Sequence, residues 1–336
     1  MDHRPLLRMA AALAATLALC PVAHAQLFRA YVSSTGLDAN PCTLQQPCRL
    51  LPAALTAVAS GGEIWMLDSA NCNASQVNVT KSVTILAVPG ALGSVVATGG
   101  GDAITINGAS IEVKLRNLVI VHYLSSQHGI NFVTGGVLNV ADCEIYGVQG
   151  NGIRVTATGG DVTVKNTVIR GSAAGSGFFA GGSVVATLDR VHLTGGAIGL
   201  YVTDGSQVKV NDSVLAGNTT NADVRSGFGT TRVAINGSVI TGGSFGVTAY
   251  ASASGAVVYV ALSDNTITHN GGGIQAQQVA GATAQVTVDT NWITYNGTGV
   301  VFAGPPLPII YSRGNNTMKF NTGDLSGGSF TALATQ

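Results

Sequence analysis

The sequence is short of charge. Charged residues make up only 10% of its 336 residues, against roughly 25% in an ordinary soluble domain. Sixteen basic and sixteen acidic residues cancel, so no broad electrostatic field favours nucleic acid or an anionic membrane. The polar surface must therefore come from Ser, Thr, Asn and Gly, and a charged partner would have to meet a local patch.

Long hydrophobic runs are absent as well. A run near the start, residues 9–19, is shorter than the roughly 20 residues that a membrane-spanning helix needs, and no later segment qualifies. It follows Arg4 and Arg8 and precedes the small-residue sequence 23–25, which is the pattern of an export signal. Residues 1–25 are therefore predicted to be a cleaved signal peptide. The mature chain is then periplasmic, on the cell surface or extracellular, without a transmembrane segment.

Cysteine is scarce, and its spacing argues against a metal site. The sequence has no C-x-x-C pair and no companion His at ligand spacing, so neither a metal nor a cofactor is predicted. Cys42 and Cys48 lie in a short polar loop with two prolines, and in an oxidising compartment they are predicted to form a disulfide. Cys143 falls on the inward side of a repeat and is expected to be a small core residue. The pairing of Cys72 stays open.

Glycine is abundant, but its 45 occurrences follow no strict triplet, which excludes collagen. Between the glycines, a hydrophobic strand pattern returns nine times at a period of about 25 residues. Units of this size cannot bury their own apolar faces and must stack on their neighbours, so the sequence predicts a solenoid. The aligned segments are 113–120, 138–145, 162–169, 186–193, 208–215, 233–240, 258–267, 286–293 and 309–318.

Each repeat contains three short strands. In one repeat these are residues 199–202, 207–210 and 213–215, and the alternation of side chains places five apolar residues inward. The five are Leu200, Val202, Val208, Val210 and Leu215. Because the turns are too short for a crossover helix, successive coils must pair in parallel. The predicted fold is all-β, a triangular, three-stranded parallel β-helix of about ten coils.

Both ends of the solenoid are predicted to be capped, since an open end exposes apolar core and unpaired strand edges. Leu51, Ala54 and Leu55 recur at helical spacing and indicate a short amphipathic helix near the N-terminus. The predicted organisation comprises a signal peptide at 1–25, an N-terminal cap at 26–75, the parallel β-helix at 76–324 and a C-terminal cap at 325–336.

Two columns of polar residues recur at the turns. The residue three positions before the closing apolar residue is often Asn, Asp or Gly, which tolerate left-handed backbone angles, so a tight bend is predicted there. This column is Asn117, Asp142, Asn166, Arg190, Asp212, Gly237, Asp264, Thr290 and Asn315. A second set lies three positions after the closing residue and consists of Asn218, Asn270, Asn296 and Asn321. Both are interpreted as structural ladders, so Asp142 and Asp264 are not candidate catalysts.

The chain resembles the secreted right-handed parallel β-helix proteins of the pectin-lyase-like superfamily. The resemblance rests on the export signal, the cap sequence 47–55 with 61–64, and coils such as 151–155 followed by 162–169, and it covers residues 28–324. These motifs are architectural. The superfamily includes polysaccharide lyases, glycoside hydrolases, uronan epimerases, phage tailspikes and members of unknown activity, so the resemblance implies a fold and not an activity.

The signatures of the enzymes in that superfamily are missing from the sequence. It lacks the Asn-Thr-Asp, Asp-Asp and Arg-Ile-Lys elements of polygalacturonases and the Asp-Pro-His-Asp motif of alginate epimerases. No acidic cluster supplies the six to eight oxygens that the calcium of a pectate lyase requires. Whether the protein is an enzyme is therefore left open.

The first strand of each coil gives the best candidate site, because in the superfamily this face commonly forms the sugar groove. Its outward positions are predicted to contain a glycine column, which breaks at Asp223; the glycines are Gly129, Gly152, Gly177, Gly199, Gly246, Gly273 and Gly299. Two positions later, on the same predicted face, comes the column Asn131, Arg154, Phe179, Tyr201, Arg225, Thr248, Gln275 and Val301. The glycan-binding candidates are Arg154, Phe179, Tyr201, Asp223, Arg225 and Tyr250.

Aromatic side chains of this kind stack on sugar rings, and arginine binds carboxylates in a bidentate manner. The leading hypothesis is an exported protein that binds a polysaccharide or a cell-envelope glycan without catalysis. An alternative is a lyase, hydrolase or epimerase acting on an acidic glycan, with Asp223 and Arg225 carrying the chemistry. A further alternative is a structural or adhesive rod, in which Asp223 and Arg225 form an ordinary ion pair. The oligomeric state is not predicted.

A rival patch lies on the third strand. Glu144, Tyr146, Arg170 and His192 are expected at outward positions there, and a Glu, an Arg and a His within a few strand spacings can do acid-base work. A solvated sheet surface with scattered polar residues explains the same pattern more simply. A nearby column of threonines, Thr194, Thr241, Thr268 and Thr294, is attributed to β-propensity.

Overall fold

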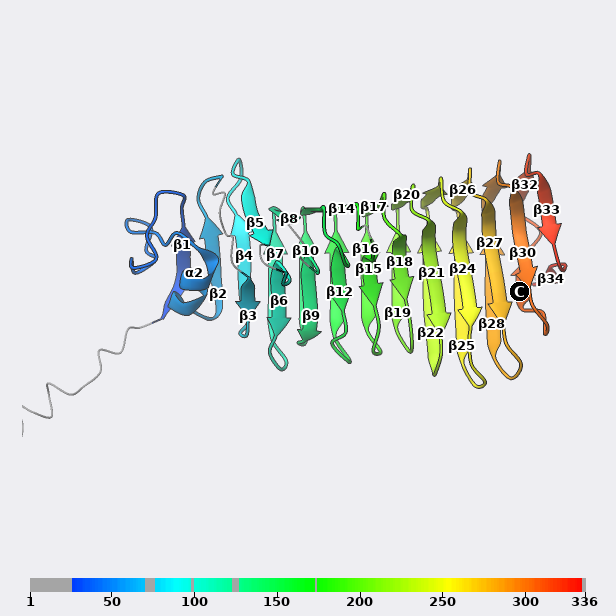
Figure 1. Cartoon of the computed structure of the whole chain (residues 1–336), viewed down its shortest axis with the longest axis horizontal. Coiled ribbons are helices and arrows are strands. Elements are labelled where there is room, and N and C mark those ends of the chain that lie inside the picture. The colour runs from blue at the N-terminus through cyan, green and yellow to red at the C-terminus, as the bar shows by residue number, and fades with distance from the viewer. Residues whose placement is uncertain (1–25, 70–75, 98–99, 123–126, 173, 334–336) are drawn as a thin grey trace, which may run out of the picture.

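The computed structural model describes residues 26–333 except 70–75, 98–99, 123–126 and 173. The described chain forms three parallel β-sheets, here named A, B and C, with a single short helix near the N-terminus. Figure 1 shows the coils following one another along one long axis, with helix α2 at the N-terminal end and the last strands at the other. The all-β, three-stranded parallel β-helix predicted from the repeats is confirmed.

The strands of each sheet follow one another at intervals of one coil. Sheet A consists of β1 (Leu27–Val32), β2 (Val58–Met66), β4 (Val83–Ala87), β7 (Glu112–Arg116), β10 (Val137–Ala141), β13 (Asp161–Lys165), β16 (Val185–Asp189), β19 (Gln207–Asn211), β22 (Thr230–Asn236), β25 (Val257–Ser263), β28 (Thr283–Asp289), β31 (Ile309–Ser312) and β34 (Thr331–Ala332). Sheet B consists of β5 (Gly93–Ala97), β8 (Leu118–His122), β11 (Glu144–Tyr146), β14 (Val168–Arg170), β17 (His192–Thr194), β20 (Val214–Ala216), β23 (Val239–Thr241), β26 (Thr266–Thr268), β29 (Trp292–Thr294) and β32 (Thr317–Lys319). Sheet C consists of β3 (Val77–Val79), β6 (Ile104–Asn107), β9 (Ile130–Thr134), β12 (Ile153–Val155), β15 (Ser176–Ala180), β18 (Ile198–Val202), β21 (Thr220–Ser226), β24 (Phe245–Ala251), β27 (Gly272–Gln278), β30 (Thr298–Ala303) and β33 (Gly323–Ser326).

The core runs through the middle of the solenoid and is built from the inward positions of all three sheets. The five residues predicted to point inward in one repeat are each at most 2% exposed; they are Leu200, Val202, Val208, Val210 and Leu215. Because the same inward pattern returns in each coil, one apolar cluster extends from Ala30 to Ile310. The stacking of coils therefore buries what no single coil can bury alone.

At the N-terminal end, helix α2 (Leu51–Ala57) buries Leu51, Ala54 and Leu55 in the core. Sheet A begins with β1 and β2, which flank the helix in the sequence, whereas sheet C begins only at β3, which α2 contacts. The helix thus covers apolar core where the first coil lacks strands of the other sheets. At the other end, β33 and β34 pair with β30 and β31. The predicted domain boundaries themselves stay predictions.

The cysteines divide as the sequence indicates. Cys42 and Cys48 are joined by a disulfide, which confirms the predicted pair. Cys143 is a free thiol buried in the core. Burial raises the pKa of the Cys143 thiol to about 12, so it remains protonated and unreactive at neutral pH. Cys72 and the predicted signal peptide lie outside the described residues.

The predicted bends between sheets A and B are real. Eight of the nine residues in that column have a left-handed φ between 47° and 62°. The exception is Asn315, where the neighbouring Gly314 takes the left-handed conformation instead. Side chains of successive bends are hydrogen-bonded: the Asn166 amide donates to Asp142 at 3.0 Å, and the Thr290 hydroxyl donates to Asp264 at 2.7 Å. The two aspartates are therefore ladder residues.

The second asparagine set forms a buried ladder at the bend between sheets B and C. The Asn270 side-chain amide donates to the Ile240 and Thr268 carbonyls and to Asn296 Oδ1. Asn296 repeats this arrangement with Asn321. A further ladder of Asn265, Asn291 and Asn316 lies at the bend between sheets A and B, one position after the column of predicted bend residues. Sequence reasoning did not identify this third ladder.

Candidate functional site

The glycine column on sheet C does not face outward, contrary to the prediction. A Cβ built on Gly246 would lie 2.4 Å from the carbonyl oxygen of Gly273 and 3.1 Å from the buried Ile267 side chain. The column faces the next coil and the core because side chains do not alternate regularly between the two faces of the strand at this point: Gly246 and Val247 are consecutive and both buried. Glycine is needed here because successive coils approach too closely to admit a side chain.

The break in the glycine column falls at Asn221, and the prediction that it falls at Asp223 is wrong. Strand pairing aligns Leu200 with Ala222, which places Asn221 opposite Gly199. Asn221 is fully buried, and its side-chain amide donates to the Thr241 carbonyl and to Asn270 Oδ1, both at 3.0 Å. It also accepts a hydrogen bond from the Asn218 side chain. Gly243 occupies the ladder position in the coil between those of Asn218 and Asn270, where a glycine has no side chain to donate. Asn221 thus bridges the ladder across this coil.

This shift changes the outward column of sheet C. Asp223, and not Arg225, follows Tyr201 in the register, and Thr248 and Gln275 come next. Arg225 lies two positions further along its strand, in a second outward column with Tyr250 and Gln277. The first column is therefore Thr105, Asn131, Arg154, Phe179, Tyr201, Asp223, Thr248 and Gln275.

The central side chains of this column touch one another across successive coils. The Arg154 guanidinium lies 5.9 Å from the centre of the Phe179 ring, and the Phe179 and Tyr201 rings meet edge to face at 5.4 Å. The Arg225 guanidinium then lies 5.8 Å from the centre of the Tyr201 ring. Five of the six predicted glycan-binding residues thus form one connected array, Arg154–Phe179–Tyr201–Arg225–Asp223. The sixth, Tyr250, borders it.

The array ends in a tight ion pair. Arg225 Nε donates to both oxygens of Asp223 at 3.0 and 2.9 Å, and Arg225 Nη2 lies 2.8 Å from Asp223 Oδ2. The Thr248 hydroxyl donates to Asp223 Oδ1 at 2.6 Å. The Asp223 side chain is only 3% exposed, so its carboxylate is held between these two neighbours. The hydrogen bonds with Asp223 raise the pKa of the Arg225 guanidinium above its usual value, which keeps this arginine charged.

A shallow hollow of about 200 Å³ opens beside this ion pair. Asp223 and Arg225 form one side of it, and Tyr250, Phe245 and Gln277 belong to its lining. Burial raises the pKa of the nearby Tyr201 phenol above its usual value, so the hydroxyl stays neutral. The lining of the hollow itself combines threonine and tyrosine hydroxyls and glutamine amides with a charge pair that is already satisfied.

Toward the N-terminus, the column continues into residues that sequence reasoning did not select. The Asn131 amide accepts a hydrogen bond from Arg154 at 3.2 Å and donates one to Asp102 at 2.7 Å. His128 Nδ1 accepts the backbone N–H of Asn151 at 2.9 Å, so the neutral ring carries its proton on Nε2. Burial and Arg154 lower the pKa of His128 below its usual value, against the opposing charge of Asp102.

Asp102 and Thr248 are not among the predicted binding residues. Thr248 stands in the predicted outward column, but the register error put Arg225 beside it in place of Asp223, so its hydrogen bond to Asp223 was not foreseen. Reading the outward column of sheet C one coil further toward the N-terminus would have found Thr105. Asp102 precedes β6 and would not have been found by this procedure, because it lies in a loop.

The rival patch on sheet B does not form a catalytic cluster. Arg170 forms an ion pair with Glu144 from the preceding coil. His192 shares the Glu144 column, but Val168 stands between them in the register. With sheet strands about 4.8 Å apart, the His192 and Glu144 backbones are separated by about 10 Å. The four residues are best described as an ion pair and two exposed rings.

Two further findings concern the described residues alone. They contain no group of three or more His, Cys, Asp or Glu side chains that could hold a metal ion. In the same part of the chain, no helix is long and apolar enough to cross a membrane.

Three parallel sheets wound into coils around one apolar core define a parallel β-helix protein, and the polar and aromatic array lies on the outer face of one of its sheets. The sequence matches the family described as right handed beta helix region over residues 102–260 and 176–329, which together span more than half of the chain. The chain belongs to this family. No curated protein sequence matches it.

One solved structure shares this fold. The crystal structure of pectate lyase Pel9A is similar with a TM-score of 0.59, at 13% identity, over 81% of this chain and 80% of that one. An identity this low shows the fold alone. The GH136 lacto-N-biosidase from Eubacterium ramulus is similar with a TM-score of 0.41, at 12% identity, over 90% of this chain and 67% of that one. A TM-score this low does not establish a shared fold.

Proposed function

We propose that this is an exported right-handed β-helix protein that binds a polysaccharide or a cell-envelope glycan on the outer face of sheet C, without catalysis. The observation that carries the proposal is the connected array from Arg154 to Asp223. It presents two aromatic rings and an arginine across neighbouring coils, and sugar rings stack on such side chains while their hydroxyls accept and donate hydrogen bonds. The superfamily fold and the pectate lyase neighbour support a glycan as the ligand.

Binding is favoured over catalysis by the state of the charged pair. Both Asp223 oxygens accept hydrogen bonds from Arg225, and one also accepts from Thr248, so a proton transfer through Asp223 would require this pair to open. Arg225 has a raised pKa and is a poor proton acceptor. A lyase, hydrolase or epimerase with Asp223 and Arg225 as its catalytic residues remains the alternative that the experiment must test.

Export is part of the proposal. Residues 1–25 are proposed to direct it and to be removed, and 26–75 and 325–336 to cap the solenoid of residues 76–324. The Cys42–Cys48 disulfide supports an oxidising compartment, since such bonds persist mainly outside the reducing cytosol. The mature protein would then meet glycans in the periplasm, at the cell surface or outside the cell.

The test is a panel of neutral and uronic-acid glycans, with binding measured by affinity gel electrophoresis. Arg154→Ala and Tyr201→Ala are each expected to weaken binding about tenfold, because each removes a ring or cation from the array. Tyr146→Ala, which removes an exposed tyrosine from sheet B, serves as the matched control and should bind normally. Unsaturated products at 232 nm or new reducing ends, abolished by Asp223→Asn, would contradict the non-catalytic role. Unchanged binding in both array variants would reject sheet C as the binding face.

A further inference from the structure

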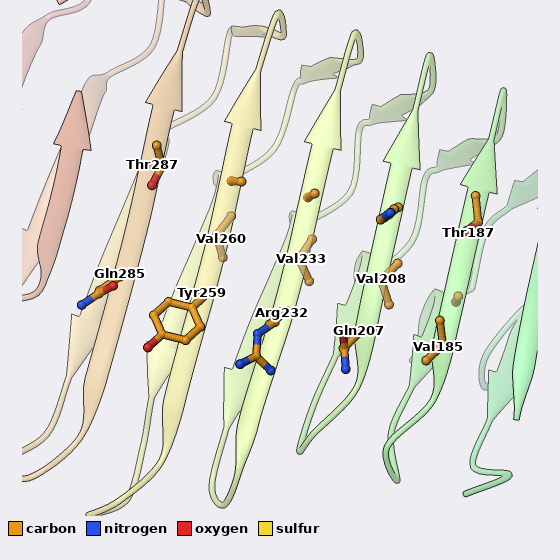
Figure 2. A pocket seen from close by; sticks show the side chains of 14 residues that line it. Val185, Thr187, Gln207, Val208, Arg232, Val233, Tyr259, Val260, Gln285 and Thr287 are labelled. Carbon is orange, nitrogen blue, oxygen red and sulfur yellow. The ribbon is translucent and has the colours of Figure 1, made fainter. Parts of the chain in front are cut away.

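A hollow on the described surface, here called the trough, lies on sheet A, away from the array on sheet C. It has a volume of about 520 Å³ and spans β16, β19, β22, β25 and β28. Figure 2 shows Gln207, Arg232, Tyr259 and Gln285 in one row across successive strands. A parallel row contains Lys209, Ala234 and Ala261. The two alanines are the reason for the hollow, because their short side chains lower the surface between taller neighbours.

The charges of this trough are unbalanced. Among the described residues, neither Lys209 nor Arg232 takes part in an ion pair. Both are exposed, and the Arg232 guanidinium lies 5.5 Å from the centre of the Tyr259 ring. The two acidic residues further along these strands, Asp189 and Asp289, are paired with arginines. The lining of the trough contains two cations and no carboxylate.

This composition differs from the array on sheet C. There, Arg225 is neutralised by Asp223, whereas the trough on sheet A keeps both positive charges available. From the strand spacing and the rise per residue, Lys209 and Arg232 lie roughly 8 Å apart along a diagonal between neighbouring coils. The trough therefore offers two separate anion contacts beside an aromatic ring and two glutamines.

We infer that this trough is a second binding site, specific for a carboxylate-bearing polysaccharide. Arg232 and Lys209 would each bind a carboxylate, Tyr259 would contact a sugar ring, and Gln207 and Gln285 would hydrogen-bond hydroxyls. The site does not depend on the array on sheet C. If both faces bind glycan, one protein molecule links two chains or holds one chain more tightly, because the second contact becomes intramolecular.

Other anionic ligands fit this trough less well. Five strands span about 19 Å, over which duplex nucleic acid presents about eleven negative charges against two cations. Acidic peptide motifs are commonly bound by clusters of arginines, whereas this trough has a single arginine. Its strands also have neighbours on both sides, so they offer no free edge to which an extended peptide could add a strand. A small anion is normally enclosed in a cleft, whereas this hollow lies open along a sheet face.

The test compares polygalacturonate and alginate with methyl-esterified pectin, which keeps a sugar backbone but masks most of its carboxylates. The double variant Lys209→Gln/Arg232→Gln is expected to lose tenfold or more of its affinity for at least one of the two carboxylated polymers, as measured by isothermal titration calorimetry. The remaining binding should depend less on salt concentration. Tyr259→Ala is expected to weaken binding while leaving the salt dependence unchanged. Lys165→Gln, which removes an exposed lysine from the same sheet outside the trough, is the control and should bind normally.

Four results would overturn the inference. Three of them are failure of the unmodified protein to bind either carboxylated polymer, equal affinity for the esterified and the free-acid glycan, and unchanged binding in Lys209→Gln/Arg232→Gln. Loss of all carboxylate-dependent binding in Arg154→Ala would also overturn it, because the ligand would then occupy sheet C. Normal carboxylate-dependent binding in Arg154→Ala and Tyr201→Ala, lost only in the sheet A variant, supports it even if sheet C binds no glycan.

Discussion

Replacing Asn221 by alanine is expected to destabilise the solenoid by about 3 kcal/mol, since it removes several buried hydrogen bonds at once. The Asn221 side chain is fully buried and satisfies the Thr241 carbonyl, Asn270 Oδ1 and the Asn218 amide. Alanine offers none of these hydrogen bonds, and the adjoining Gly243 has no side chain to replace them. These partners keep other hydrogen bonds, and each buried hydrogen bond that is lost costs about 1 kcal/mol net.

The loss of stability in Asn221→Ala should be concentrated near the substitution as well as lowering the stability of the whole solenoid. In a solenoid, stability is approximately a sum of coil terms and interfaces between neighbouring coils, so one weakened interface opens before the rest. Native-state hydrogen exchange should therefore show the greatest loss of protection in β21 and β24, and urea unfolding followed by circular dichroism should give the lower midpoint. Asn78→Ala, which changes an exposed asparagine on sheet C, is the control. A uniform or negligible change in protection would show that Asn221 does not bridge the ladder.

The repeat pattern was sufficient to predict the coils and most of their bends. A left-handed bend constrains which residues can occupy it, so the Asn, Asp and Gly column carried its own signal in the sequence. Arg190 and Thr290 adopt the same conformation although neither residue type favours it, and only their position in the period revealed them. The buried residues of each coil could also be predicted from the repeat pattern, because alternate apolar side chains of every strand must point into the one shared core.

The register of the coil around Asn221 was not predictable in the same way. The prediction treated glycine as the marker of the column, and this coil has asparagine at the marker position. Whether asparagine fits depends on the next coil, where Gly243 leaves the space that the Asn221 amide fills: a Cβ on Gly243 would lie 2.8 Å from Asn221 Nδ2. Such a compensation between coils is a fact of three-dimensional packing. Its consequence was a two-residue error that exchanged Arg225 for Asp223.

The candidate sites show the same division. Column reading correctly grouped Arg154, Phe179 and Tyr201, because residues one coil apart in the same register must be neighbours. It could not show that the charge of Asp223 is neutralised in an ion pair with Arg225, since that depends on the directions of the two side chains. The trough on sheet A was missed because its depth comes from Ala234 and Ala261, and small apolar residues do not indicate a binding site in a sequence.

Replacing Gly246 by alanine is expected to cost about 3 kcal/mol, at the upper end of the usual penalty for overpacking. The added Cβ would lie 2.4 Å from the Gly273 carbonyl oxygen, which belongs to the backbone of the next coil. That oxygen cannot rotate away as a flexible side chain would, so β24 and β27 must separate or tilt. The same Cβ would also lie 3.1 Å from the Asn270 amide and disturb the buried ladder.

A graded series separates this steric effect from the general effect of replacing glycine. At Gly177 the nearest backbone oxygen would lie 2.8 Å from the new Cβ, so Gly177→Ala should lower the urea midpoint less than Gly246→Ala. At Gly323 nothing lies within 4 Å and φ is not left-handed, so Gly323→Ala should leave stability unchanged or raise it slightly through the lower entropy of the unfolded chain. An equal loss in all three variants would contradict the close approach of coils as the reason for the column. The order Gly246, Gly177, Gly323 ties the glycine column to the spacing between coils, which also sets how closely the residues of the sheet C array contact one another.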